Sequence, residues 1–168
     1  MKTIVSILTI LTLSIGSVGM SDNELCSSSP TEEKIDYESR IRIVLENEGI
    51  DPYITELIVA QSKFESGNYK NTLTPYNNVF ARHYSKKDTF AISAGAPAEG
   101  HSRFAKYPSV ESATLSQLWY FRKKKYSFKW KSPYQFALEL KQKHYYEADL
   151  MLYTKGLIRH MKDNKTKN

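Results

Sequence analysis

Helical spacing on either side of a segment rich in proline and glycine is the feature that most constrains this fold. Apolar residues recur about every 3.6 residues in five segments, most of them bounded by capping residues, prolines or glycines. Residues 68–108 keep no such period, so short strands or an irregular lobe are expected there. The sequence therefore predicts a mainly α fold, with helices at 37–48, 52–66, 110–121, 133–142 and 147–161.

The N-terminal part of the chain differs from the rest. Lys2 precedes an uncharged stretch whose first half is apolar and whose second half holds small residues up to Gly19. This pattern predicts a signal peptide over 1–19, or an N-terminal membrane anchor if the segment is not cleaved. Export to the periplasm, the cell envelope or the extracellular space follows. After it we expect a linker over 20–34, one domain over 35–162 and a polar tail over 163–168.

Charge and cysteine content limit the partners and cofactors. The 24 Lys and Arg against 18 Asp and Glu give a net charge of +6, which favours an anionic partner such as nucleic acid, an anionic membrane or an acidic wall polymer. The single cysteine excludes an internal disulfide framework and a Cys-rich zinc site. We predict no cofactor. We also predict no metal, because the four histidines are not spaced as metal ligands are: His83, His101, His144 and His160. We expect a solvated basic face that could bind an anionic surface weakly. It consists of Arg122–Lys125, Lys129 and Lys131.

Glu65 is the residue whose position suggests chemistry. It lies in the final turn of a helix with an apolar face, beside Phe64 and just before Gly67. The negative end of the helix dipole and an apolar wall both disfavour a carboxylate, so both would raise the pKa of Glu65. A carboxylic acid protonated near neutral pH is what a general acid for glycosidic cleavage requires. The spacing alone does not distinguish such an acid from a solvated glutamate before a glycine cap, and the solvated glutamate is the more common arrangement.

Four short blocks, taken in chain order, give this glutamate a context. They are 61–67 (Gln-Ser-Lys-Phe-Glu-Ser-Gly), 77–81 (Asn-Asn-Val-Phe-Ala), 104–112 (Phe-Ala-Lys-Tyr-Pro-Ser-Val-Glu-Ser) and 143–153, which begins Lys-His-Tyr-Tyr and ends in a second Tyr. Together they resemble the bacterial peptidoglycan-cleaving β-N-acetylglucosaminidases of glycoside hydrolase family 73. The resemblance extends over about residues 54–157, nearly all of the predicted domain.

The resemblance implies a lysozyme-like fold, in which a helical body and a smaller lobe enclose a cleft. It also implies hydrolysis of the β-1,4 bond between N-acetylglucosamine and N-acetylmuramic acid in peptidoglycan. Glu65 falls on the general acid of the family, Tyr145 on a tyrosine across the cleft, and Asn77 and Asn78 on the cleft floor. Beyond the resemblance, Tyr107 and Tyr146 are candidate stacking surfaces for sugar, with core packing as the alternative.

The second carboxylate of such a site is less closely defined by the sequence. In the family it lies in the smaller lobe before the third block, and Glu99 occupies that place here. Asp88 is the other acid between Glu65 and Phe104. Glu99 could activate water, stabilise a cation or lie in solvent as an ordinary loop residue. The sequence leaves open the inverting or retaining outcome and which glycosidic bond of the repeat is cut.

Several positions depart from the family pattern, and other functions have to be weighed. Ala81 replaces a glycine, Arg82-His83 replaces Ile-Lys, Ala105 replaces an arginine, and Tyr69-Lys70 replaces an aromatic-glycine pair. These changes bear on substrate preference more than on fold. The alternatives are a lytic transglycosylase or muramidase on the same fold, a non-catalytic wall-binding or assembly module, and a nucleic-acid binder. Residues 68–90 lack the transglycosylase block, and export argues against nucleic acid. We expect a monomeric peptidoglycan hydrolase.

Overall fold

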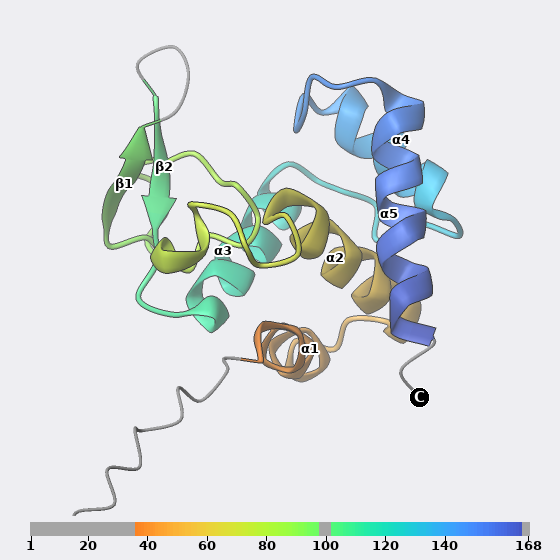
Figure 1. Ribbon diagram of the computed structural model, residues 1–168, viewed down its shortest axis with the longest axis horizontal. Helices are drawn as coiled ribbons and strands as arrows, with labels where there is room; N and C mark the ends of the chain where they lie inside the picture. Colours follow the sequence, from red (N-terminus) through yellow and green to blue (C-terminus); the bar gives the residue numbers. More distant parts are fainter. Residues whose placement is uncertain (1–35, 98–101, 166–168) are drawn as a thin grey trace, which may run out of the picture. The chain divides into compact units, whose positions relative to one another are not determined.

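The computed structural model describes residues 36–97 and 102–165, and within these the chain is mainly helical (Figure 1). The elements are α1 (Tyr37–Asn47), α2 (Pro52–Glu65), the short 3-10 helix η1 (Thr74–Tyr76), β1 (Ser93–Pro97), β2 (Arg103–Lys106), α3 (Val110–Lys123), α4 (Pro133–Gln142) and α5 (Leu150–Lys165). The predicted mainly α fold, with two helices before an irregular segment and three after it, is confirmed.

Helix α2 is the centre of the domain. Its residues are buried on nearly every side, as expected for a helix without a solvent-facing stripe. It packs against α1 and α5, while α1 also packs against α3 and α4 against α5. Asp51 starts the helix, because its side chain accepts hydrogen bonds from the backbone N–H groups of Tyr53 and Ile54. Gly67 ends it in the left-handed conformation (φ +58°), which a residue with a Cβ adopts at a cost.

The last helix begins later than the sequence predicted. Helix α5 starts at Leu150 instead of Glu147, because Asp149 caps it by accepting from the backbone N–H of Leu152. The carbonyls of Glu147 and Ala148 accept from the Lys141 ammonium instead of taking part in a helical ladder. The predicted apolar stripe is confirmed by burial of Tyr153 and Leu157, with Leu150 and Met161 packed against the core.

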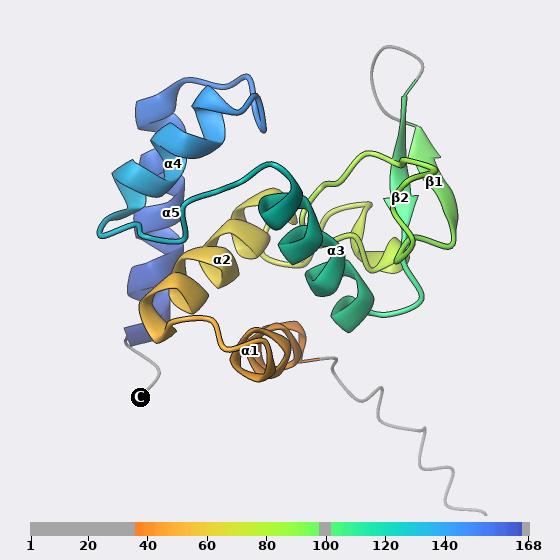
Figure 2. The same cartoon turned by 180° about the vertical axis from the view of Figure 1, so that it is seen from behind.

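A small lobe lies between α2 and α3 in the sequence and contains the only sheet within the described residues. Strands β1 and β2 pair antiparallel, with Ser93 opposite Lys106 and an irregularity after Ala94. Figures 1 and 2 show this sheet at the opposite end of the domain from α4 and α5, with α2 and α3 between them. The expected lobe of short strands is therefore present, and it faces the α4–α5 end across the central helices.

Two buried polar side chains hold this lobe in place. The Asn78 amide donates to the carbonyls of Arg82 and Ala105, and its oxygen accepts from the Arg82 backbone N–H. The Asp88 carboxylate accepts from the hydroxyls of Tyr107 (3.1 Å) and Ser116 (2.6 Å). Because Ser116 belongs to α3, Asp88 fastens the lobe to the helical body.

Several predictions fall on parts of the chain outside the described residues. The predicted signal segment and linker (1–34), the residues around Glu99 (98–101) and the end of the predicted tail (166–168) lie there. Within the described residues, no helix is both long enough and apolar enough to cross a membrane.

Replacing Asn78 with alanine tests the anchoring of the lobe. Asn78→Ala removes three hydrogen bonds from a fully buried position and leaves backbone groups without partners, so we expect the unfolding free energy to fall by about 2–3 kcal/mol. Asn77→Gly is the control, since the Asn77 amide makes one hydrogen bond, to the Tyr107 carbonyl, and glycine accepts the left-handed backbone at this position (φ +54°). Denaturant titration measures both variants, and an equal loss in the two would contradict the anchoring role of Asn78.

Candidate active site

Glu65 is the last residue of α2, and its carboxyl group is half-buried. The Tyr153 hydroxyl, from α5, donates to Glu65 Oε1 at 2.6 Å. The Phe64 ring packs edge-on against the Tyr153 ring with centroids 4.9 Å apart. The Asn71 amide donates to the backbone carbonyl of Glu65 at 2.9 Å, which ties down the end of the helix. The carboxyl group is therefore held on an apolar wall by one strong donor.

This environment sets the protonation state of Glu65. Loss of hydration on burial raises the pKa of Glu65 to about 7, from an ordinary value of 4.5, and the hydrogen bond from Tyr153 opposes part of that rise. The group therefore carries a proton through the mildly acidic range and gives it up near neutrality. Such a carboxyl group can donate a proton to a leaving oxygen, which a solvated glutamate at the same pH cannot.

A chain of buried side chains extends from Glu65 into the core. The Gln117 amide donates to Gln61 Oε1 at 3.2 Å, the Gln61 amide donates to the Tyr153 hydroxyl at 3.5 Å, and Tyr153 donates to Glu65. Gln117 also donates to the Tyr145 hydroxyl at 3.3 Å, and Tyr145 donates to the Phe80 carbonyl at 2.8 Å. Each donor in the first branch points toward Glu65, so the hydrogen bonds reinforce one another.

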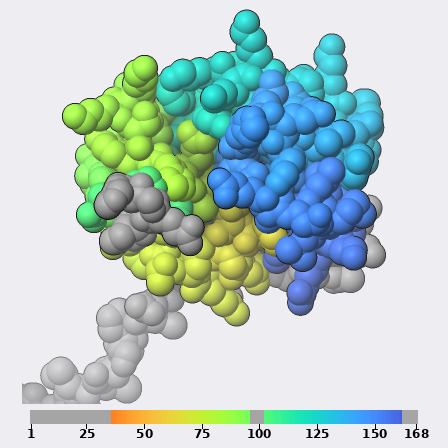
Figure 3. All heavy atoms as spheres, turned by 90° about the horizontal axis from the view of Figure 1, so that it is seen from above, coloured from red at the N-terminus to blue at the C-terminus, as the bar shows by residue number. Residues whose placement is uncertain are grey.

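The direction of this chain decides which oxygen of Glu65 carries the proton. Oε1 is occupied as the acceptor of the Tyr153 hydrogen bond. Oε2 has no hydrogen-bond partner among the described residues, and it is not one of the enclosed polar atoms. Oε2 is therefore the oxygen that is open to hold or to give up a proton. Figure 3 shows one face of the domain hollowed between the green and the blue residues, with yellow residues at the bottom of the hollow.

Close packing fixes the position of Tyr153. The Tyr146 ring stacks on the Tyr153 ring at 3.8 Å with an angle of 6° between the planes. The Tyr146 hydroxyl in turn donates to the Ala137 carbonyl of α4. Gly156, one turn along α5, touches the Phe64 ring so closely that a Cβ there would lie 2.3 Å from a ring carbon. The bare backbone at this position lets α5 approach α2 closely enough for the Tyr153–Glu65 hydrogen bond.

Comparison with known proteins gives the family and the fold of this chain. The family model described as "Glucosaminidase: Mannosyl-glycoprotein endo-beta-N-acetylglucosaminidase" matches residues 40–166. This chain belongs to the glucosaminidase family. None of the curated proteins matches it. A chain in the solved "Structure of a type VI secretion system effector-immunity complex from Pseudomonas protegens" has a similar fold, with a TM-score of 0.58 and 18% identity over 76% of this chain and 89% of that one. Membership of the glucosaminidase family supports a glycoside hydrolase that acts on peptidoglycan.

The structure brings some of the predicted glucosaminidase site residues together and separates others. Glu65 and Tyr145 share the hydrogen-bonded chain, and Tyr146 supports it through Tyr153. Asn78 and Tyr107 lie in the interior, where their polar groups are taken up by the lobe and by Asp88, so we do not carry them forward as substrate contacts. The remaining predicted site residues lie elsewhere: Asn77 is at the lobe boundary with its amide on the Tyr107 carbonyl, and Glu99 is outside the described residues.

Four residues of the site were not assigned a role from the sequence, although Gln61 and Tyr153 stand in two of the family blocks. They are Gln61, Gln117, Tyr153 and Gly156. Tyr153 occupies a core position of the α5 stripe, so its pattern indicated packing and not a hydroxyl bonded to a carboxyl group. Gln61 carried a usable signal, because an uncharged amide on the most buried helix requires buried partners.

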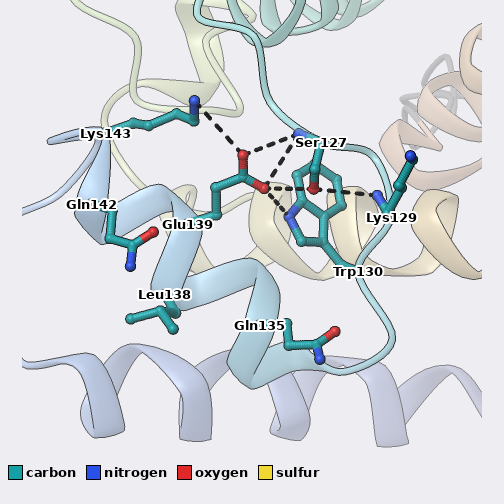
Figure 4. A pocket seen from close by; sticks show the side chains of 8 residues that line it. All are labelled: Ser127, Lys129, Trp130, Gln135, Leu138, Glu139, Gln142 and Lys143. Carbon is teal, nitrogen blue, oxygen red and sulfur yellow. Dashed lines mark hydrogen bonds and ion pairs between the residues drawn. The ribbon is translucent and has the colours of Figure 1, made fainter.

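A pocket of about 500 Å³ lies elsewhere, between α4 and the loop before it (Figure 4). Glu139 is the carboxylate at its wall, and it accepts from the Ser127 backbone N–H and hydroxyl and from the Trp130 indole N–H. Both oxygens of this carboxylate accept hydrogen bonds from these neighbours, whereas at Glu65 only Oε1 accepts one from a described residue. Within the part of the chain that the structure describes, no cluster of His, Cys, Asp and Glu could hold a metal ion.

The buried acid makes stability depend on pH in a way that Glu65→Gln should remove. Because the pKa of Glu65 is raised from 4.5 to about 7, the folded state retains a proton that the unfolded state has lost between these values. The unfolding free energy therefore falls as the pH rises through this window, by up to about 3 kcal/mol. We expect Glu65→Gln to match the wild type near pH 4.5 and to be more stable above pH 7. Chemical denaturation at several pH values measures the difference, and a difference that is constant with pH would contradict the shifted pKa.

Proposed function

We propose that this protein hydrolyses the β-1,4 bond between N-acetylglucosamine and N-acetylmuramic acid in peptidoglycan, with Glu65 as the general acid. The observation that carries the proposal is the half-buried Glu65 carboxyl group, whose pKa lies at about 7 and whose Oε1 is held by Tyr153. Family membership supports the class of reaction. The four sequence blocks support peptidoglycan as the substrate.

In the proposed reaction, Glu65 Oε2 gives its proton to the glycosidic oxygen as the bond from that oxygen to the anomeric carbon breaks. The sugar takes on oxocarbenium character, and water supplies the hydroxyl group that completes hydrolysis and returns a proton to the site. Glu65 is left as a carboxylate, an anion that the Tyr153 hydroxyl stabilises through a charge-assisted hydrogen bond. The hydrogen bond from Tyr153 is therefore strongest after the proton has left Glu65. It stabilises the transition state more than the bound substrate, and that difference lowers the barrier.

Tyr145 and Glu99 complete the proposed machinery. Burial and the nearby Glu65 charge hold the pKa of Tyr145 well above its ordinary value, so its phenol stays protonated. We propose that this phenol contacts the acetamido group of the sugar or stabilises the positive charge that develops on the sugar ring. Glu99 is the proposed second carboxylate, since the resemblance places it in the small lobe. The exposed basic residues after α3 are proposed to hold the protein weakly to anionic wall polymer; they include Lys124, Lys125, Lys129 and Lys131.

Digestion of purified sacculi by the wild type, Glu65→Gln and Glu46→Gln tests the proposal. Glu46 is an exposed glutamate on α1 and serves as the matched control. We expect soluble fragments ending in reducing N-acetylglucosamine, lost by about 1,000-fold or more in Glu65→Gln and unchanged in Glu46→Gln. Mass spectrometry of the products identifies the ends.

Each other outcome assigns a different function. Reducing muramic acid ends would make the protein a muramidase, and anhydromuramic ends a transglycosylase. A folded protein that pellets with sacculi without releasing fragments would be a binding module.

Tyr153→Phe separates the role of this hydroxyl from that of a packing residue. The hydrogen bond from Tyr153 lowers the pKa of Glu65, so its removal should move the alkaline limb of the pH–rate profile to higher pH, by about one unit. The maximal rate should fall by about 10- to 100-fold, because the carboxylate formed on proton transfer loses its donor. Tyr134→Phe, at an exposed tyrosine of α4, is the control. A lower rate with an unmoved limb would assign Tyr153 to packing alone.

A further inference from the structure

Arg82 is a half-buried cation that has no acidic partner among the described residues. The other two half-buried arginines, Arg40 and Arg42, form ion pairs with Glu111 and Glu56. No ion pair or side-chain hydrogen bond joins the Arg82 guanidinium to a described residue, and its Nε atom is enclosed without an acceptor. An enclosed guanidinium N–H without a partner is costly, and proteins seldom keep one unless it has a use.

The position of this guanidinium is defined by aromatic rings. Its central carbon lies 3.8 Å from the centroid of the Tyr120 ring, a cation–π contact. The Tyr120 ring packs edge-on against the Tyr145 ring, with centroids 5.8 Å apart. The Tyr145 hydroxyl reaches back to the Phe80 carbonyl, two residues before Arg82 in the chain. The guanidinium therefore lies on the lobe side of Tyr145.

The same phenol connects Arg82 to the general acid. Burial and the Glu65 charge raise the pKa of Tyr145, and the Arg82 cation acts in the opposite direction. Both charged groups thus lie within Coulombic range of one hydroxyl. A sugar chain that presents its glycosidic oxygen to Glu65 and passes along Tyr145 would bring its next substituents toward Arg82.

We propose that Arg82 binds a carboxylate carried by the muramic acid unit of the substrate. This inference rests on the proposed function, which supplies the glycan. The two terminal nitrogens of Arg82 are not among the enclosed atoms, so their parallel N–H donors are open to a carboxylate, and the enclosed Nε side strengthens such a pair. N-acetylglucosamine is neutral, whereas muramic acid carries a lactyl carboxylate when it is bare and a stem peptide with carboxylates when it is substituted. Arg82 is then the residue by which the site distinguishes peptidoglycan from a neutral glycan.

The position of Arg82 in the sequence fits a role in specificity. It follows directly after the block at 77–81, where Arg82-His83 replaces the Ile-Lys of the family pattern. Arg82 also leads into the lobe, since its carbonyl accepts from the Ala105 backbone N–H and its own N–H is bound by Asn78. The backbone is thus anchored while the side chain is left without an acidic partner.

Binding and turnover on three glycans test the inference. The glycans are peptide-bearing peptidoglycan strands, strands stripped of peptide so that the lactyl carboxylate is free, and neutral chito-oligosaccharides. Dissociation constants are measured in the Glu65→Gln background, so the test does not require turnover, and KM and kcat are measured with Glu65 intact. Arg82→Gln and Arg82→Lys are compared with Arg159→Gln, which removes an exposed arginine from α5. Thermal unfolding of each variant checks its folding.

We expect Arg82→Gln to weaken binding to at least one acidic glycan by about 10-fold or more and to raise its KM similarly, with kcat changed less. Binding to chito-oligosaccharides should stay within about two-fold, and Arg82→Lys should fall between. A loss confined to stripped strands identifies the lactyl carboxylate, and a loss confined to peptide-bearing strands identifies the stem peptide. Equal losses on acidic and neutral glycans, or no loss on any, would overturn the inference. Turnover of sacculi by Arg82→Gln with wild-type KM would overturn it while leaving the proposed function intact.

If Arg82→Gln does not fold, the wild type provides the second measurement. Its affinity for the acidic glycans should fall as salt is raised from about 50 to 500 mM, with little change for the neutral glycan. An affinity for the acidic glycans that does not fall with salt, or one that falls equally for the neutral glycan, would contradict the carboxylate contact.

Discussion

The hydrogen bond from Tyr153 to Glu65 is the interaction on which the rest of the site depends. It joins α5 to the end of α2 across 88 positions of sequence, and it places a donor against a carboxyl group in an apolar setting. Burial makes the acid hold its proton to about pH 7, and the donor makes the conjugate base tolerable once the proton has left. Without the donor the carboxyl group would be a weaker acid, and without burial it would be ionised before a substrate arrived.

Much of the surrounding core can be understood as support for this contact. Gly156 lets α5 come close to Phe64, and Tyr146 covers the other side of the Tyr153 ring. Behind them, Gln61 and Gln117 give direction to the hydrogen-bond chain, so that the Tyr153 hydroxyl points at Glu65 and not into the core. Apolar side chains could fill the space that these polar groups occupy. Because α2 is otherwise the apolar centre of the fold, their presence there indicates a role beyond packing.

The lobe contributes Val79 and Phe80 to the apolar core, and buried hydrogen bonds hold the rest of it. Two buried polar side chains hold its loops: Asn78 donates to two backbone carbonyls and accepts from one backbone N–H, and Asp88 joins the lobe to α3 through Ser116. This arrangement brings Phe80 and Arg82 beside Tyr145, so the lobe contributes one wall and the helical body the acid. The division of labour matches the roles proposed for them, a rigid helix end for proton transfer and a loop for the choice of substrate.

What the sequence by itself determined is local in origin. Asp51-Pro52 and Gly67 set the bounds of α2, the apolar stripe of α5 could be seen in its spacing, and the end of α2 together with three further blocks indicated Glu65 and the family. Caps, turns and helical periods act over a few residues, so the chain carries them in readable form. Glu147 shows the limit even there, because the Asp149 cap fixed the start of α5 three residues later than the spacing predicted.

The tertiary structure alone decided which polar side chains serve the site and which serve the fold. Asn78, Tyr107 and Tyr153 all stand in motifs of the family and are all buried, yet only Tyr153 bonds the acid. Asparagine, tyrosine and glutamine can each bind backbone, side chain or substrate, and the sequence does not tell these uses apart. The choice depends on which helix packs against which and how closely, a property of contacts between residues far apart in the chain.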